Sequence, residues 1–403
     1  MNAFRPPMNL PLEGIRVIEV AQYVAGPLAG SLLAELGADV IKIEPPGGDA
    51  YRQVMPVAPD VGRFFVPLNR GKRSVVLDLK SAVGRDALAR LVATAGVVVH
   101  NSPAPRAEAF GLGWDALHAA HPALVVGVVT SFGPHGPLAG SPAYDLVAQG
   151  RSGLLTSHAS RGDSVPVRAG GIPMADLTAG HLLATGVVAA LVRARTVGEG
   201  QLIEVSLLGA ALAVQIQDLV WLGVDAERLA TPATRDDLTA RADEIAGGLA
   251  MNPYYRCYEA ADGFLALACL NITQRQSFIE LFGLADATIA APDLVPADPS
   301  VLAEKQHITR LIEAAVAAEP VEAWLARFGV VSVPAGPVLT RETVHRDAQA
   351  RANGLIQDVH QPGLGGVTML GGVFRIDGND PPASRPAPVL GADTEAVLAE
   401  VGG

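Results

Sequence analysis

Residues 15–44 decide the fold class of this chain, and they read IRVIEVAQYVAGPLAGSLLAELGADVIKIE. The β-branched content of Ile15–Val20 predicts a strand. Pro27–Leu36 predicts a helix that Gly37 ends, and Val40–Glu44 predicts the next strand. Apolar strands spaced by a helix in this way favour a parallel sheet.

The same alternation continues to residue 130. Further strands are predicted at Val75–Leu79, Val97–His100 and Leu124–Thr130, with a helix at Val83–Ala95. The pattern indicates an α/β fold with a mainly parallel sheet and helices on both faces. In such a fold, the ligand is expected beyond the carboxyl ends of the strands.

The second half of the chain has a different pattern of predicted strands and helices. Pro253–Leu270 predicts two strands joined by a turn at residues 261–263, and helices follow at Thr273–Phe282 and Leu302–Ala318. The Gly- and Pro-rich end is expected to pack across another surface. We therefore predict a large domain in residues 1–222, a linker in 223–250, a small α+β domain in 251–340, and a C-terminal segment in 341–403 that returns to the large domain.

Composition excludes several classes of protein. Of the 403 residues, 49% are hydrophobic and 18% are charged, which excludes global disorder. A net charge of -11 argues against nucleic acid or an anionic membrane as the main partner. The two cysteines and nine histidines form no disulfide framework and no metal-ligand pattern. Without a secretory signal at its N-terminus, the chain is expected to be cytoplasmic.

Asp176 is the most informative single residue. It follows a glycine pair and Pro173, and it precedes the apolar run Leu177–Val192, which predicts a buried helix. A carboxylate at a helix N-terminus stays ionised near neutral pH, and it can attack an activated acyl group. The same position also suits a helix N-cap, a frequent role of aspartate.

Other segments offer weaker signals for a site. Residues 69–74 form a compact basic loop that could bind phosphates or could be a solvated turn. Asn101 follows the carboxyl end of a predicted strand, where it could be a ligand-binding residue or an ordinary turn residue. Gly26 and Pro27 suit a phosphate-binding turn, but the dinucleotide fingerprint is absent, so a nicotinamide cofactor is disfavoured. Gly247 and Gly248 could form the hinge of a mobile cover or an ordinary loop.

Taken together, the segments resemble one enzyme family. The matching pieces, in order, are residues 12–19, 25–27, 36–44, 69–74, 144–149, 170–181, 198–201 and 387–391. They are similar to the class III CoA-transferases, whose relatives include the α-methylacyl-CoA racemases. The resemblance covers nearly the whole chain, and the combination is specific although no single piece is.

The resemblance implies a Rossmann-like large domain, a small domain, and two subunits interlocked like links of a chain. It implies acyl-CoA and a carboxylic acid as substrates, with coenzyme A as a substrate and no permanently bound cofactor. Asp176 matches the family's nucleophile, which carries CoA as a thioester. Positions implied in CoA binding are Val24, Ala25, Arg70, Lys72, Arg73, Asn101 and Arg106. Possible catalytic support is implied for Tyr144, Asp145, Gln149, Gly247 and Gly248.

The chain departs from the family pattern in places. Ala109 stands where some transferases have an arginine, and Pro142 stands where a lysine precedes the family tyrosine. The racemases have a histidine where this chain has Tyr144, and tyrosine is a poor base at neutral pH. These observations favour a CoA-transferase, with a racemase and a non-catalytic acyl-CoA-binding protein as alternatives.

Overall fold

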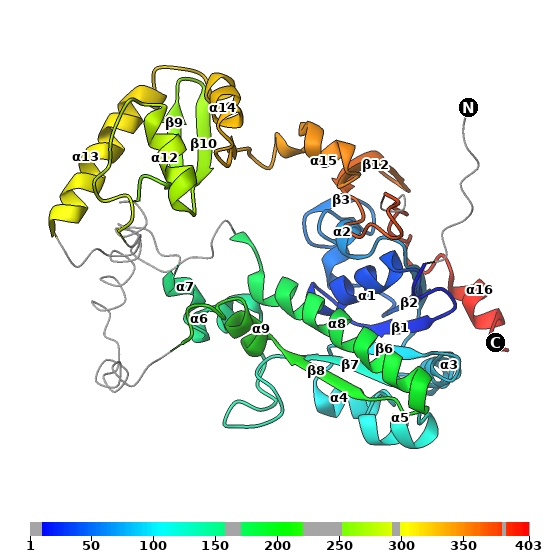
Figure 1. The fold of residues 1–403 in the computed structure, drawn as a ribbon. Helices are drawn as coiled ribbons and strands as arrows, with labels where there is room; N and C mark the ends of the chain where they lie inside the picture. The colour runs from blue at the N-terminus through cyan, green and yellow to red at the C-terminus, as the bar shows by residue number, and fades with distance from the viewer. Residues whose placement is uncertain (1–9, 158–170, 221–251, 292–298, 381–383, 403) are drawn as a thin grey trace. The chain divides into compact units, whose positions relative to one another are not determined.

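The computed structural model describes residues 10–157, 171–220, 252–291, 299–380 and 384–402 of the chain (Figure 1). The chain forms two compact units. The larger unit comprises residues 1–154, 168–222 and 345–403, and the smaller comprises 155–167 and 223–344. The predicted linker at 223–250 lies outside the described residues.

The larger unit is built on a six-stranded sheet in which every neighbouring pair of strands is parallel, so the predicted parallel sheet is confirmed. Its strands in spatial order are β5 (Arg73–Val76), β2 (Asp39–Glu44), β1 (Arg16–Val20), β6 (Val97–His100), β7 (Val125–Thr130) and β8 (Leu202–Ser206). The chain moves outward from β1 to β5 and then begins again at β6 on the other side of β1. The crevice between the ends of β1 and β6 is therefore the topological switch point, where open α/β sheets bind ligands.

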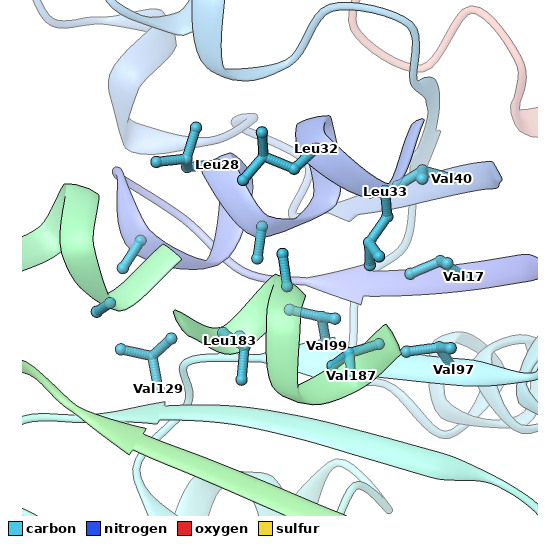
Figure 2. Packing of buried hydrophobic residues seen from close by; sticks show 14 of the residues in the cluster. Val17, Leu28, Leu32, Leu33, Val40, Val97, Val99, Val129, Leu183 and Val187 are labelled. Carbon is cyan, nitrogen blue, oxygen red and sulfur yellow. The ribbon is translucent and has the colours of Figure 1, made fainter. Parts of the chain in front are cut away.

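Helices cover both faces of the sheet, as predicted (Figure 1). On one face, α1 (Ala25–Glu35), α8 (Met174–Val197) and α9 (Leu207–Ala213) pack against alternate strand residues. Figure 2 shows Leu28, Leu32 and Leu33 of α1 and Leu183 and Val187 of α8 converging on valines of the central strands. Each such buried side chain contributes about 1.5–3 kcal/mol of hydrophobic stabilisation.

The opposite face carries the second half of the core. There α3 (Ala82–Val92), α4 (Ala104–Ala109), α5 (Trp114–Ala120) and α16 (Thr394–Ala399) cover the other alternate residues of the strands. Val17 and Ile18 illustrate the division, because they are neighbours in β1 and yet belong to opposite clusters.

α8 is longer than the predicted run Leu177–Val192 and begins three residues before it. Among the described helices, α8 has the length and mean hydropathy of a membrane span, a property that the core helices of other folds share. Ala179, Leu183 and Val187 face the sheet core, which accounts for its apolar character. α9 follows β8 directly and ends at Ala213.

The smaller unit has its own core. The hairpin of β9 (Tyr255–Ala260) and β10 (Gly263–Ala268) confirms the predicted pair of strands, and β11 (Ala335–Pro337) completes an antiparallel sheet. Three helices pack on it: α12 (Ile272–Glu280), α13 (Pro299–Val316) and α14 (Val321–Val330).

The C-terminal segment contains a hairpin that was not predicted, formed by β12 (Ile356–Gln361) and β13 (Gly365–Leu370). Val359 and Met369 of this hairpin share a small core with Phe65 of the larger unit. The remaining elements are η1 (Ala50–Arg52), β3 (Pro56–Ala58), β4 (Val61–Gly62), α2 (Phe65–Leu68), α6 (Asp145–Arg151), α7 (Leu154–Ser157), η4 (Val344–Arg346) and α15 (Ala348–Ala352).

A buried charge network lies under the carboxyl ends of β1 and β2. The Lys42 ammonium is 3.0 Å from Glu19 Oε1 and 2.8 Å from Asp49 Oδ2, and all three side chains are fully buried. Lys72, also fully buried, lies 2.7 Å from Glu19 Oε2. A Cβ on Gly30 would lie 1.8 Å from that same oxygen, so α1 needs a glycine there to pass over the network.

The two lysines respond differently to burial. Although burial alone lowers it, the carboxylates of Glu19 and Asp49 raise the pKa of Lys42 above its usual value. Burial lowers the pKa of Lys72 to about 8, and the nearby charge of Lys42 adds to this shift, whereas Glu19 opposes it. Lys42 is thus the cation that compensates the buried acids.

Lys42→Met should strongly destabilise the larger unit. The substitution leaves Glu19 and Asp49 buried with one cation fewer, and breaking a buried ion pair costs about 3–5 kcal/mol. Chemical denaturation of the two proteins measures the difference. In the exposed pair Arg193–Glu199, Arg193→Met should cost about 0–1 kcal/mol. Equal losses in the two variants would contradict a structural role for the network.

His100, the last residue of β6, should make stability depend on pH. Burial lowers the pKa of His100 to about 4 from its usual 6.5, so the unfolded chain binds more protons between these values. Stability is complete above pH 6.5 and falls by about 1.4 kcal/mol per pH unit towards pH 4. Urea unfolding of His100→Phe across this range should show a flatter profile than the wild type. Substitution of the exposed His135 should leave the profile unchanged, and parallel profiles for His100→Phe would refute the assignment.

Candidate functional site

The predicted ligand residues that follow β1 and β6 meet at the switch point. Asn101, after β6, donates from Nδ2 to the Gln22 carbonyl at 2.8 Å and accepts from the Gln22 amide at 3.2 Å. Gln22 lies in the turn that joins β1 to α1, just before Val24 and Ala25. Three of the predicted CoA-binding positions are therefore brought together at the edge where α/β sheets bind ligands.

The turn after β1 has an unusual backbone. Tyr23 adopts a left-handed conformation with φ of 71°, which costs a non-glycine residue about 1 kcal/mol. Asp49 Oδ1 accepts from the amides of Tyr23 at 3.4 Å and Tyr51 at 2.9 Å. Because Lys42 holds the other oxygen of Asp49, the buried charge network also fixes this turn.

α8 approaches the same turn closely. A Cβ on Gly180 would lie 2.8 Å from the Ala25 carbonyl oxygen and 2.9 Å from Leu28 Cβ, so a larger residue would push α8 away from α1. Asp176 precedes Gly180 by about one helical turn. The candidate nucleophile and the candidate CoA-binding turn are therefore neighbours.

Asp176 is the third residue of α8 and is half-buried. The N-cap position belongs to Pro173, whose side chain makes no capping hydrogen bond, so the N-cap interpretation of Asp176 is wrong. An acid in the first turn still lies in the favourable field of the helix N-terminus, which stabilises its ionised form.

Asp145 supplies the cap from another helix. This buried carboxylate at the start of α6 accepts from the amides of Ala175 at 2.9 Å and Asp176 at 3.4 Å. Its second oxygen accepts from Gln149 Nε2 at 2.7 Å, and Gln149 also donates to the Ile172 carbonyl at 3.2 Å. Asp145 and Gln149 thus position the backbone that carries Asp176.

Tyr144 is the N-cap residue of α6 and is 65% exposed. Its ring lies 5.6 Å from that of Tyr23 in an edge-to-face arrangement. A hydrogen bond with Tyr144, together with burial, raises the pKa of Tyr23 above its usual value. Tyr144 therefore joins the α6 side of the site to the turn after β1.

The cationic side chains of residues 69–74, which were predicted to bind phosphates, form ion pairs with acidic residues of the same chain. Lys72 is buried against Glu19, and its ammonium also donates to the Pro27 and Leu68 carbonyls at 2.7 and 2.9 Å. This geometry argues against a phosphate contact for Lys72. Arg70 pairs with Glu35 at 2.8 Å, and Arg73 pairs with Asp39 and Glu400.

Two exposed cations at the carboxyl edge of the sheet have no such partner. Within the described chain, neither Lys80, four residues after β5, nor Arg106, on α4 after β6, forms an ion pair. Arg106 was among the predicted CoA ligands, whereas Lys80 was not. Lys80 lies shortly after a strand of the parallel sheet, near the edge at which such folds bind ligands.

The remaining predictions do not add to this site. Gly247 and Gly248 lie outside the described residues. His181 is exposed, and its Nδ1 lies 2.7 Å from the Leu177 carbonyl of its own helix. In the part of the chain that the structure describes, no group of three or more His, Cys, Asp or Glu side chains could hold a metal ion.

The arrangement combines a carboxylate at a helix start with a nearby turn of tightly packed backbone and with exposed cations along the same edge. These features suit an activated acyl group bearing a phosphorylated carrier. They offer a nucleophile rather than a pair of bases on opposite sides of one carbon.

Comparison with known proteins agrees with this geometry. The family model for CoA-transferase family III matches residues 12–394. A succinate–glutarate CoA-transferase of Agrobacterium fabrum is 33% identical over 98% of this chain and 97% of its own length. A probable fatty acyl-CoA transferase of Mycobacterium tuberculosis is 33% identical over 68% of this chain and 70% of its own length.

A solved structure gives the same result for the fold. A CaiB/BaiF family protein from Brucella suis superposes with a TM-score of 0.78 at 28% identity, covering 98% of this chain and 100% of that one. The match of the family model over nearly the whole length shows that this chain belongs to CoA-transferase family III and is an enzyme of that class.

Proposed function

We propose that this CoA-transferase works through a covalent aspartyl-CoA thioester on Asp176. The observation that carries the proposal is the cap supplied by Asp145. Because Asp145 accepts the first-turn amides of α8, the Asp176 carboxylate is not required as the cap of its own helix. Asp145 and Gln149 act as positioning residues, since they hold the backbone and not the reacting atoms.

The steps balance without a cofactor. The Asp176 carboxylate attacks the thioester carbonyl, a C–O bond forms, the C–S bond breaks, and CoA leaves as a thiolate. The thiolate attacks the aspartyl carbonyl of the resulting mixed anhydride and releases the donor carboxylate. The acceptor carboxylate then attacks the aspartyl thioester, and the thiolate released attacks the acceptor acyl carbon. Acyl-CoA leaves, Asp176 is regenerated, and the thioester energy is conserved throughout.

The switch point provides the binding groups for CoA in this proposal. The turn at Val24 and Ala25 offers backbone groups near Asp176, and Asn101 fixes that turn. Lys80 and Arg106 supply exposed positive charge for the phosphates at the same edge. Racemisation is disfavoured because Tyr144 stands where the racemases have a histidine, and tyrosine is a poor base at neutral pH.

We further propose that two copies form an interlocked homodimer. Large apolar side chains are exposed on α9 and just beyond it, and patches of this kind mark association surfaces. They are Leu212, Val214, Ile216, Leu219 and Val220. Light scattering should give twice the mass of 41.6 kDa. A monomer at micromolar concentration would refute this part of the proposal.

Asp176→Asn should abolish transfer and adduct formation together. The amide is a poor nucleophile, so we expect kcat to fall by on the order of 10³-fold or more. Intact mass after incubation with acetyl-CoA, succinyl-CoA or hexanoyl-CoA should show a hydroxylamine-sensitive CoA adduct on the wild type, with the modified peptide containing Asp176.

The matched control is Asp115→Asn, because Asp115 is an exposed acid in the first turn of α5. This variant should keep both transfer and adduct. An Asp176→Asn enzyme that turns over at the rate of the wild type would rule out the covalent aspartyl route.

A further inference from the structure

Four aromatic side chains follow one another from the hairpin of β3 and β4 to the start of α6. Ring centroids are separated by 6.1 Å for Phe64 and Tyr51, 5.6 Å for Tyr51 and Tyr23, and 5.6 Å for Tyr23 and Tyr144. These residues form the aromatic ladder. Tyr23 stands edge-on to both of its tyrosine neighbours, with interplanar angles of 85° and 74°.

The ladder is exposed despite its apolar character. Tyr23 is 36%, Phe64 44% and Tyr144 65% exposed. Further apolar side chains are exposed beside the ladder along the chain: Val54, Met55, Val57, Leu146 and Val147. Exposed apolar side chains gathered in one region of a protein often mark a binding site.

One end of the ladder lies at the proposed nucleophile. Tyr144 immediately precedes Asp145, whose carboxylate accepts the amide hydrogens of Ala175 and Asp176. Tyr23 immediately precedes Val24 and Ala25, and the Ala25 carbonyl faces α8 at Gly180. Through Asp145, the Tyr144 end of the ladder is therefore linked to the first turn of α8, which carries Asp176.

The backbone conformation of Tyr23 is unfavourable for a residue with a side chain, which indicates a function for its ring. A glycine would adopt φ of 71° without strain, and yet this turn carries a large side chain. Strain held in place at a site is a sign of function rather than of folding.

We propose that the aromatic ladder is the acyl-binding subsite of this enzyme, and that its preferred substrates are carboxylic acids with an apolar alkyl or aryl body. The proposal rests on the aspartyl mechanism above. In a ping-pong reaction, both acyl groups react at Asp176, so the same surface selects the donor and the acceptor. Rings bind such bodies through burial and through edge and face contacts.

Short diacids fit this surface poorly. A second carboxylate on the substrate would need a cation to pair with, whereas Tyr144 at the end of the ladder is followed by the acid Asp145. Arg52, beneath the ladder, is buried and paired with Glu44 at 2.7 Å. The exposed Arg63 adjoins Phe64, three ring-to-ring steps from Tyr144.

The adenine of CoA is the competing occupant of an aromatic surface. The pantetheine arm separates adenine from the reacting thioester, whereas one end of the ladder adjoins Asp145, which caps the helix of Asp176. Adenine binding would make the ring of Tyr23 equally important for every CoA thioester. Acyl binding makes its importance grow with the apolar size of the acyl group.

The test is a competition among acceptors on the CoA-loaded enzyme. The wild type, loaded from whichever of acetyl-CoA, succinyl-CoA or hexanoyl-CoA gives the adduct, is mixed with equal concentrations of hexanoate, 3-phenylpropanoate, succinate and glutarate. Mass spectrometry of the acyl-CoA products gives the ratios of kcat/KM directly. We expect the two apolar acids to exceed the diacids by about tenfold or more.

Tyr23→Gly removes the ring while preserving the left-handed turn, so it should reduce that preference by about tenfold and raise the KM for hexanoyl-CoA more than that for acetyl-CoA. Tyr144→Leu should weaken the preference for 3-phenylpropanoate as an independent check. Tyr23→Phe should keep the preference, because the ring remains. Phe374→Ala is the matched control, since Phe374 is 39% exposed and lies by Glu35 at the other end of α1.

Each result decides between the alternatives. Diacid products in excess from the wild type, or an unchanged preference in both Tyr23→Gly and Tyr144→Leu, would overturn the acyl subsite while leaving the aspartyl mechanism intact. An equal rise in KM for acetyl-CoA and hexanoyl-CoA in Tyr23→Gly would assign the ladder to adenine. Absence of a CoA adduct with every thioester would instead refute the proposed function.

Discussion

The ion pairs of Lys42 with Glu19 and Asp49 are the interactions on which the site depends. They join the ends of β1 and β2 to the segment that follows β2, and Asp49 in turn holds the amides of Tyr23 and Tyr51. A buried charge is tolerated when it is paired with opposite charges. Here the pairing requires β1, β2 and the segment after β2 to be correctly placed relative to one another. The conformation of the turn after β1 therefore depends on the folded core and not on the residues of the turn alone.

The sequence was sufficient for the architecture of the larger unit. Apolar, β-branched strands separated by amphipathic stretches can bury both of their faces in a parallel sheet covered by helices on each side. The structure forms this sheet. Two parts were missed for identifiable reasons. Strand β8 contains Glu204 and Ser206 and lies at the sheet edge, where apolar content is low. The hairpin of β12 and β13 lies in a Gly- and Pro-rich stretch that resembles a loop, and it depends on Phe65 for part of its core.

The site could be predicted in part. Asp176 and Asp145 lie at helix starts and Asn101 follows a strand, and these positions are local properties that the sequence shows. The cap that Asp145 supplies to α8 is not local, since it joins residues 31 positions apart. The burial of Lys72 could not be predicted for a similar reason. A basic loop looks accessible in sequence, and nothing there shows that Glu19 points at it from beneath.

The attachment of the C-terminal segment has a consequence for solubility. β5 is an edge strand of the sheet, and its outward amides at Ser74 and Val76 donate to Asp393 Oδ2 and Thr394 Oγ1 at 2.8 and 3.0 Å. Unpaired edge amides are a template on which a strand from another molecule can add. Two side chains at the start of α16 thus block strand addition, and the last residues of the chain protect the fold from aggregating through its first sheet edge.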